Sequence, residues 1–207
     1  MNTGAEIIPP SYSERLLGAQ VSNNFTWNEH ICDNEKSMLK MITSRVNALK
    51  KISWSADFKT RKMIANAIVM SRLVYLVQVY GNAAEFLLKF LQVIQNKAAR
   101  CVTRLRWGTE TSVLLNQVGW LSVKQLIVFH SLVQLFKIKE TGKPATLRLK
   151  FRDSFAYKTR NPDKSKDAFV YKSTVLWNNL PPEIRKIQKL DKLKIELKKW
   201  VKLNTEV

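Results

Sequence analysis

Cysteine is rare in this chain of 207 residues, and so is histidine, with two residues of each. Two cysteines are too few for a disulfide framework, and the first residues show no secretory leader pattern, which indicates an intracellular protein of the nucleus or cytoplasm. Cys32, Cys101, His30 and His130 would match the four ligands of a structural zinc, but only His30 and Cys32 lie close together in the sequence. We therefore expect no metal site and no reactive thiol, since neither cysteine has a recognisable neighbouring base.

Paired carboxylates and glycine-rich loops are also missing. The six aspartates stand at positions 33, 57, 153, 163, 167 and 191, so no adjacent pair is available to clamp the two metal ions of phosphoryl transfer. The six glycines include no pair at the spacing of a phosphate-binding loop. These absences predict a chain that is not an enzyme, with no catalytic residues, no cofactor and no small-molecule substrate.

Acidic residues are few compared with basic ones. Lys and Arg number 35 against 16 Asp and Glu, which gives a formal net charge of +19 at pH 7. Residues 1–60 hold seven basic and six acidic side chains, residues 61–140 eleven and three, and residues 141–207 seventeen and seven. Self-repulsion of this size favours a polyanionic partner, so the predicted partners are nucleic acid or an anionic membrane surface.

One long apolar run, residues 63–80, raises the question of a membrane span. Arg72 stands near its centre, where an arginine costs about 2.5–3.5 kcal/mol on membrane-insertion scales. We therefore interpret the run as a buried helix and do not expect a membrane span.

The N-terminal segment is not typical of the start of a domain. Pro9-Pro10 breaks any helix, and residues 15–27 suggest a short strand and a polar turn at Ser22-Asn23-Asn24. This strand has no obvious partner. A chain that begins inside a larger sheet domain would show such a pattern.

Helical periodicity dominates the sequence between residues 34 and 140. Apolar stripes of period 3.6 alternate there with capping and stop signals, so about four or five helices are predicted. The clearest signals are Ser55 or Asp57 as a cap, Gly81-Asn82 and Gly119 as stops, and Ser122 as a further cap. The expected helices run from 33 or 34 to 53, from 55 or 57 to 80, from 84 to 106, from 109 to 119 and from 122 to 142.

The C-terminal part has weaker patterns. Residues 145–180 lose clear periodicity and carry aromatic residues among basic ones, and Pro181-Pro182 then opens a last amphipathic helix. We predict a mainly α fold: a short strand region at residues 1–32, a helical bundle at 33–142 and a basic helical extension at 143–207.

The expected third helix carries the most informative pattern. With residues placed at 100° intervals from Lys89, the arc between about 100° and 220° is apolar. It holds Phe90, Cys101, Ile94, Leu87, Leu105, Ala98, Leu91 and Val102. A second arc, between about 0° and 80°, is cationic and holds Lys89, Arg100, Arg104 and Lys97, with Arg106 at its edge. The pattern predicts a buried face beside a positively charged one.

A charged helix face is most often only a solvated surface. Here, however, Glu85 and Glu110 are the only acids that flank the cations, so the interspersed acids of a salt-bridged surface are missing. We therefore expect this face to contact nucleic-acid phosphates without reading the base sequence. A rival interpretation is a non-catalytic module for a membrane surface or a protein partner, which would use residues 63–80 and the last helix.

Several short motifs occur in a characteristic order. The first is Leu17-Gly18 followed by Phe25, Trp27 and His30-Ile31, and the next are Thr60-Arg61-Lys62, Tyr75 and Tyr80-Gly81-Asn82-Ala83. The later ones are Gln92 with Gln95-Asn96-Lys97-Ala98-Ala99-Arg100, Gly119-Trp120-Leu121-Ser122-Val123, Tyr157-Lys158-Thr159-Arg160, Leu176-Trp177-Asn178-Asn179-Leu180-Pro181, Glu183-Ile184-Arg185 and Leu193-Lys194. From about Glu14 onward, this order resembles the end of the reverse transcriptase of non-LTR (LINE-type) retrotransposons, in particular the jockey-like group. Tyr80 departs from the pattern, because tryptophan is common there.

The resemblance implies the end of a palm domain at residues 1–32, a helical thumb that grips the template–primer duplex at 33–142, and a C-terminal extension. The family's catalytic Tyr/Phe-x-Asp-Asp turn and third aspartate precede the region covered, so no catalytic residue is carried over to this chain. The expected function is sequence-independent binding of RNA or of an RNA–DNA duplex. A palm supplied in trans by a partner is an alternative that the sequence leaves open.

Overall fold

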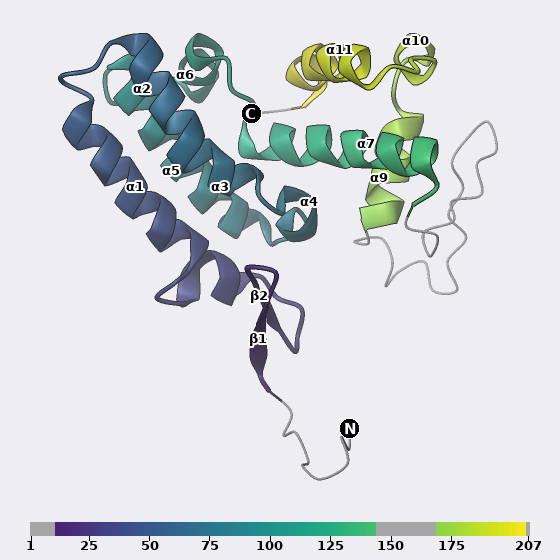
Figure 1. Ribbon diagram of the computed structural model, residues 1–207, viewed down its shortest axis with the longest axis horizontal. Coiled ribbons are helices and arrows are strands. Elements are labelled where there is room, and N and C mark those ends of the chain that lie inside the picture. Colours follow the sequence, from purple (N-terminus) through teal and green to yellow (C-terminus); the bar gives the residue numbers. More distant parts are fainter. Residues whose placement is uncertain (1–10, 144–168, 206–207) are drawn as a thin grey trace.

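A computed structural model of the chain describes residues 11–143 and 169–205 (Figure 1). Their regular structure is helical apart from one two-stranded hairpin, so the predicted mainly α fold is confirmed. Two hydrophobic clusters organise the helices. The larger one joins residues between 31 and 126, and the smaller one joins the last helices to residues 132–136.

The N-terminal hairpin consists of β1 (Ser13–Leu16) and β2 (Ala19–Ser22), which pair antiparallel. Leu17 and Gly18 form its turn with φ of 49° and 86°, and two consecutive positive φ angles are typical of the tight type I′ hairpin turn. The expectation of a strand without a partner is therefore wrong. The partner lies in the same segment, because the chain also reverses at Leu17-Gly18. The predicted turn at Ser22-Asn23-Asn24 is confirmed, since the Phe25 amide donates to the Ser22 carbonyl at 3.0 Å.

Two hydrogen bonds fasten the hairpin segment to the helical bundle. Tyr75 Oη donates to the Leu17 carbonyl at 2.7 Å, and Trp27 Nε1 donates to Asn82 Oδ1 at 2.7 Å. A π-helical turn, η1 (Glu29–Asp33), follows and packs on the start of the bundle. The bonded residues are 55 and 58 positions apart in the sequence and belong to the sequence motifs. These motif residues therefore hold the hairpin against the helical bundle.

The second predicted helix is divided into four pieces. Their bounds are α2 (Phe58–Ala65), the π-helical turn η2 (Asn66–Met70), α3 (Ser71–Val74) and α4 (Val77–Tyr80). Asp57 caps α2 as expected, since its carboxylate accepts a hydrogen bond from the Thr60 amide at 3.0 Å. The prediction of one continuous helix to residue 80 is wrong, because the backbone widens at η2 and turns at Leu76, where φ is 56°.

Four other helices correspond to predicted ones: α1 (Met38–Ile52), α5 (Glu85–Thr103), α6 (Thr111–Val118) and α7 (Val123–Thr141). Gly119 ends α6 with φ of 70°, which glycine adopts without strain. Ser122 opens α7 with a reciprocal cap: its Oγ accepts from the Gln125 amide at 3.2 Å, and Gln125 Oε1 accepts from the Ser122 amide at 3.0 Å. These predicted caps and stops are confirmed.

Long-range contacts lie within and just beyond the second predicted helix. At η2 the Ile68 carbonyl accepts a hydrogen bond from Arg45 Nη1 of α1 at 2.9 Å. Beyond α4, Gly81 lies against α7 so closely that a β-carbon there would be 2.7 Å from Ile127 Cγ2. Such contacts join segments far apart in the chain, so local periodicity does not reveal them.

The apolar run 63–80 is buried on one face only, since Met63, Tyr75 and Val79 are 64%, 51% and 45% exposed, so the buried-helix interpretation holds in part. Val69, Leu73 and Val77 are fully buried. In the part of the chain that the structure describes, no single helix is long and apolar enough to cross a membrane, and α6 and α7 meet that criterion only as a pair bent by 50°.

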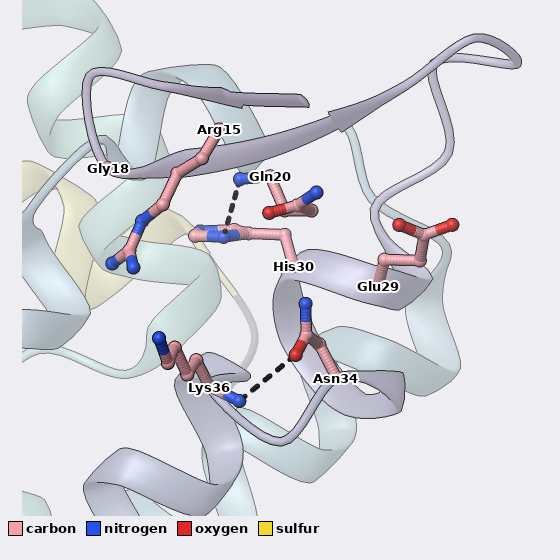
Figure 2. A pocket seen from close by; sticks show the side chains of 7 residues that line it. All are labelled: Arg15, Gly18, Gln20, Glu29, His30, Asn34 and Lys36. Atoms are coloured by element: carbon pink, nitrogen blue, oxygen red, sulfur yellow. Dashed lines mark hydrogen bonds between the residues drawn. The ribbon is translucent and has the colours of Figure 1, made fainter. Parts of the chain in front are cut away.

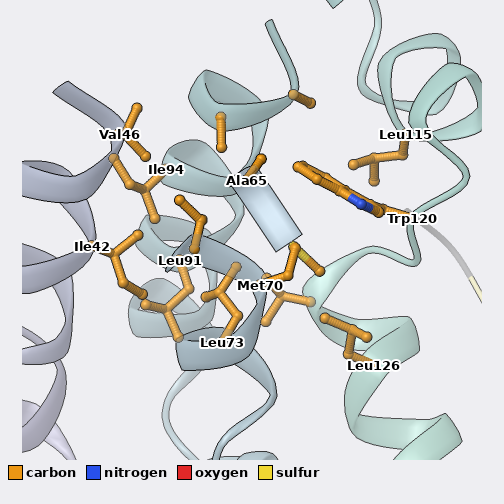
Figure 3. Close-up of a cluster of buried hydrophobic side chains, with 14 of the residues drawn as sticks. Ile42, Val46, Ala65, Met70, Leu73, Leu91, Ile94, Leu115, Trp120 and Leu126 are labelled. Carbon is orange, nitrogen blue, oxygen red and sulfur yellow. The ribbon is translucent and has the colours of Figure 1, made fainter. Parts of the chain in front are cut away.

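The larger cluster forms where α1, α5 and the η2–α3 segment meet (Figure 3). Ile42 and Val46 of α1 lie beside Leu91 and Ile94 of α5, and Met70 and Trp120 close the side toward α6 and α7. Ala98 and Ala99 of α5 are fully buried. Their small side chains let α5 approach its neighbours closely.

The smaller cluster joins the C-terminal helices to α7. They are α9 (Phe169–Asn178), α10 (Pro182–Arg185) and α11 (Leu190–Asn204). Helix α9 lies where the sequence shows no clear periodicity, and the last predicted helix is two helices, separated at residues 186–189. Leu193, Leu197 and Val201 of α11 are fully buried.

Helix α7 contributes side chains to both clusters, so it connects the two groups of helices that Figure 1 shows on either side of it. The division of the chain after residue 142 stays a prediction. Residues 1–10 and 144–168, with Pro9-Pro10 and the Tyr157–Arg160 motif, lie outside the described residues.

Candidate nucleic-acid interface

Helix α5 turns one face to the bundle and one to the solvent. The inner face packs on α1, α2 and α6 and buries Leu91, Ala98 and Val102 completely. The apolar arc of the sequence wheel therefore corresponds to the buried face of this helix, and the cationic arc corresponds to an exposed face. Phe90 and the residues at the helix end are exceptions.

Four of the five predicted phosphate-binding residues are exposed, and of these the side chains of Lys89, Lys97 and Arg106 make no hydrogen bond to the backbone within the described residues. Lys89 Nζ lies 4.0 Å from Glu85 Oε1, but the side chains are 71% and 62% exposed, so this ion pair is weak. Lys97 and Arg106 form no ion pair within residues 11–143 and 169–205. All three can approach a phosphate without breaking a contact that the fold needs.

Arg104 is held by the backbone of the α1–α2 connection. Its Nη2 donates to the carbonyls of Ser53 at 2.6 Å and Trp54 at 3.0 Å. Helix α5 ends at Thr103, and Arg104 follows in the left-handed conformation with φ of 59°. The predicted helix end at residue 106 is therefore wrong, and the wheel angles of Arg104 and Arg106 do not describe their directions.

Arg100 is half-buried and lies over an aromatic ring. Its guanidinium carbon is 4.9 Å from the ring centroid of Trp107, and its Nη2 donates to the Thr109 carbonyl at 3.4 Å. Its Nε is buried with no hydrogen-bond partner. Arg100 thus joins the end of α5 to the loop before α6 and keeps only part of its hydrogen-bonding capacity for a ligand.

The solvent face of α5 also carries apolar side chains. Phe90 was assigned to the buried arc, but it is 47% exposed, so that assignment is wrong. It stands at the edge of the arc and packs edge-to-face on Phe86 of the preceding turn, with ring centroids 6.2 Å apart. Val93 is 52% exposed beside them. The cations therefore alternate with exposed apolar groups.

Arg61 is a structural residue that reasoning from the sequence pattern missed. It is 6% exposed, and its guanidinium donates to the carbonyls of Val102 (2.8 Å), Ala56 (2.5 Å) and Ser53 (3.4 Å). Val102 and Ser53 lie at the C-terminal ends of α5 and α1, where helix dipoles favour a positive charge. Burial and the neighbouring Arg104 lower the pKa of Arg61. In the sequence, only its position in the Thr60-Arg61-Lys62 motif indicated that Arg61 has a specific role.

The amide residues of the α5 motif also serve the fold. Gln95 and Asn96 are buried, and Gln92 Nε2 donates to both of their side-chain oxygens at 2.9 and 2.8 Å. The three side chains hold the segment that leads to α7 through hydrogen bonds to Val123 N, Leu121 O and Thr111 Oγ1, each at 2.8 Å. The amides of the motif therefore serve packing between helices, whereas Lys97 of the same motif is exposed to solvent.

A small cavity of about 200 Å³ lies between the hairpin and the start of α1 (Figure 2). His30 forms its centre, and its Nδ1 accepts a hydrogen bond from the Gln20 amide at 3.3 Å. Burial lowers the pKa of His30, and Arg15 lowers it further. The other lining residues are Gly18, Gln20, Glu29, Asn34 and Lys36.

Neither thiol is activated in this environment. Burial raises the pKa of Cys32 and of Cys101, and Asp33 adds to the effect at Cys32. Among residues 11–143 and 169–205, no three His, Cys, Asp or Glu side chains come together as metal ligands.

The sequence is distantly similar to a transposon polymerase. A protein of Drosophila melanogaster described as "Probable RNA-directed DNA polymerase from transposon X-element" is 24% identical over 131 residues, which cover 60% of this chain. The match covers 14% of that protein's length. No known protein-family profile matches the chain, and no solved structure matches it.

This similarity corrects one expectation. The chain was predicted not to be an enzyme, because its sequence lacks paired carboxylates. The matched protein is described as a polymerase, and this chain spans only a small part of it. The carboxylates missing from this chain therefore do not exclude enzymatic activity, and the prediction that it is not an enzyme is wrong.

Proposed function

We propose that this chain is part of the reverse transcriptase of a non-LTR, jockey-like retrotransposon, and that it grips a template–primer duplex by its phosphate backbone. The observation that carries the proposal is the solvent face of α5, where Lys89, Lys97 and Arg106 are exposed on a protein of net charge +19. The distant similarity to a transposon polymerase and the order of the sequence motifs support the family. In this proposal residues 33–142 form the thumb.

The dimensions of α5 suit a duplex. Lys89 and Lys97 are eight residues apart, which corresponds to about 12 Å along a helix. Double-stranded nucleic acid carries a phosphate about every 3.4 Å along each strand, so this face spans several phosphates. Arg100 lies over Trp107, and Arg104 is bonded to the Ser53–Trp54 backbone. These two arginines border the phosphate-binding surface and add to its positive electrostatic potential. Because phosphates are the same in every sequence, binding is independent of base sequence.

The first prediction tests this surface with substitutions that leave fold contacts intact. The variant Lys89→Gln/Lys97→Gln/Arg106→Gln should bind an RNA–DNA duplex more weakly, and the slope of log affinity against log salt should fall by about two to three units, at ~0.9 per phosphate contact. Fluorescence anisotropy over a salt series measures both quantities.

The matched control is Lys186→Gln/Lys192→Gln/Lys198→Gln, which removes the same charge from exposed positions of the C-terminal segment. It should retain most of the affinity and of the salt slope. Equal losses in the two variants would mean that binding follows total charge, and the role given to α5 would then be wrong.

A second candidate function is a protein-interaction module, which the exposed Phe86, Phe90 and Val93 favour. A Phe86→Ser/Phe90→Ser variant separates the two functions: it should keep the salt-dependent duplex binding of the wild type if phosphates are the ligand. The membrane-surface version has less support, because Leu193, Leu197 and Val201, the apolar side of the last helix, are buried against the bundle.

A further inference from the structure

Two tryptophans stand almost fully in the solvent at one end of the bundle. Trp54 is 79% exposed and Trp107 is 87% exposed. A tryptophan is a large apolar side chain, and exposing it without a partner gives up favourable burial. Trp54 follows the C-terminal end of α1, and Trp107 follows the C-terminal end of α5, where α1 and α5 pack together.

Each exposed ring has an arginine on one side. The guanidinium carbon of Arg104 lies 5.6 Å from the centroid of Trp54, and that of Arg100 lies 4.9 Å from the centroid of Trp107. Arg104 is fixed by two backbone carbonyls and Arg100 by one, so each guanidinium is a preset support for its ring. The high exposure of the rings leaves their other surface open.

Such a pair of supported rings fits one ligand chemistry well. A nucleobase is a flat π system that stacks on an aromatic ring, and a guanidinium beneath the ring strengthens the stack by a cation–π interaction. Trp107 directly follows Arg106, an exposed cation of the phosphate surface, and Trp54 is linked to the end of α5 because its carbonyl accepts from Arg104 at 3.0 Å. If a single strand leaves the duplex at this end, its phosphates can contact the cations and its bases can stack on the tryptophan rings.

We infer that Trp54 and Trp107 form a stacking platform for unpaired bases, so that this chain binds a junction between duplex and single strand. The inference rests on the proposed function and extends it from the duplex to the unpaired strand beside it. Stacking accepts every base, so the platform adds affinity without sequence preference.

The test compares three probes for the full chain: a blunt RNA–DNA duplex, the same duplex with a short single-stranded overhang of either polarity, and the same duplex with an abasic overhang. The abasic overhang keeps the phosphates and removes the bases. The wild type should bind one base-bearing overhang more tightly than its abasic counterpart by about fivefold or more. In Trp54→Leu/Trp107→Leu this ratio should fall to about one with blunt-duplex affinity unchanged, whereas Trp54→Phe/Trp107→Phe, which keeps a ring, should retain most of it.

Equal binding of base-bearing and abasic overhangs by the wild type would overturn the platform. The blunt duplex reports separately on the proposed function, because salt-dependent binding there needs only the phosphate surface. Vesicles containing phosphatidylserine serve as a further probe, since exposed tryptophans beside arginines also suit a lipid surface. A blue shift of tryptophan emission with vesicles, and no change with the base-bearing overhang, would assign the two rings to lipid and overturn the inference.

Discussion

Individual arginines have different tasks in this protein, although they look alike in the sequence. Arg61 is buried and satisfies three carbonyls, Arg104 is tied to two carbonyls, and Arg106 is exposed. Removing a buried donor leaves its acceptors desolvated and unsatisfied, whereas removing an exposed cation changes mainly the surface field. Substitution of Arg61 should therefore affect mainly stability, whereas substitution of Arg106 should affect mainly binding.

Arg61→Met should lower the free energy of unfolding by about 1–3 kcal/mol or more, because the side chain fills similar space but leaves the carbonyls of Val102, Ala56 and Ser53 without their donor. Urea unfolding followed by circular dichroism measures the change. Lys59→Met, at an exposed position of the same helix, is the control. If both variants unfold at the same urea concentration, Arg61 does not hold the ends of α1 and α5 together.

At the scale of elements, α7 joins the two hydrophobic clusters, and its contact with the turn after α4 sets how closely it can approach. A β-carbon at Gly81 would lie 2.7 Å from Ile127 Cγ2 and 2.7 Å from the Val77 carbonyl oxygen. The side chain of Ile127 can be shortened, but the carbonyl is backbone and stays in place.

Gly81→Ala should therefore destabilise the protein by about 1–3 kcal/mol through overpacking. In a double-mutant cycle with Ile127→Ala, the double variant should lose less stability than the sum of the single losses, with a coupling of about 0.5–3 kcal/mol. Thermal unfolding of the four proteins gives the cycle. Strict additivity would show that Gly81 and α7 are not in tight contact.

For the whole molecule, stability should depend on pH through its two histidines. Burial lowers the pKa of His30 and of His130, and Arg15 and Lys137 respectively lower them further. The unfolded chain, with histidine near its ordinary value of about 6.5, then binds protons more readily than the folded protein. The stabilising contribution is present above that value and is lost as the pH falls through the folded pKa.

The melting temperature should consequently fall as the pH is lowered from about 7 to about 5, a range above the titration of ordinary carboxyl groups. His30→Gln/His130→Gln should melt at a temperature that changes less over the same range. Differential scanning calorimetry in buffers of constant ionic strength makes the comparison. An equally steep fall in the variant would assign the pH dependence to other groups.

The sequence by itself determined the helical class, most helix ends from α5 to α7 and the excess of positive charge. Caps and periodicity depend on a few neighbouring residues, such as Ser122 with Gln125, so they are visible in the chain. Only the tertiary structure decided which cations of the α5 face are free. Arg104 and Arg61 donate hydrogen bonds to backbone carbonyls about 40 to 50 positions away in the sequence. Phe90 stays exposed because no helix of the described residues covers its side of α5. The hairpin is a local pairing across Leu17-Gly18, whereas the packing of α9 on α7 joins distant segments and is not encoded by a local pattern.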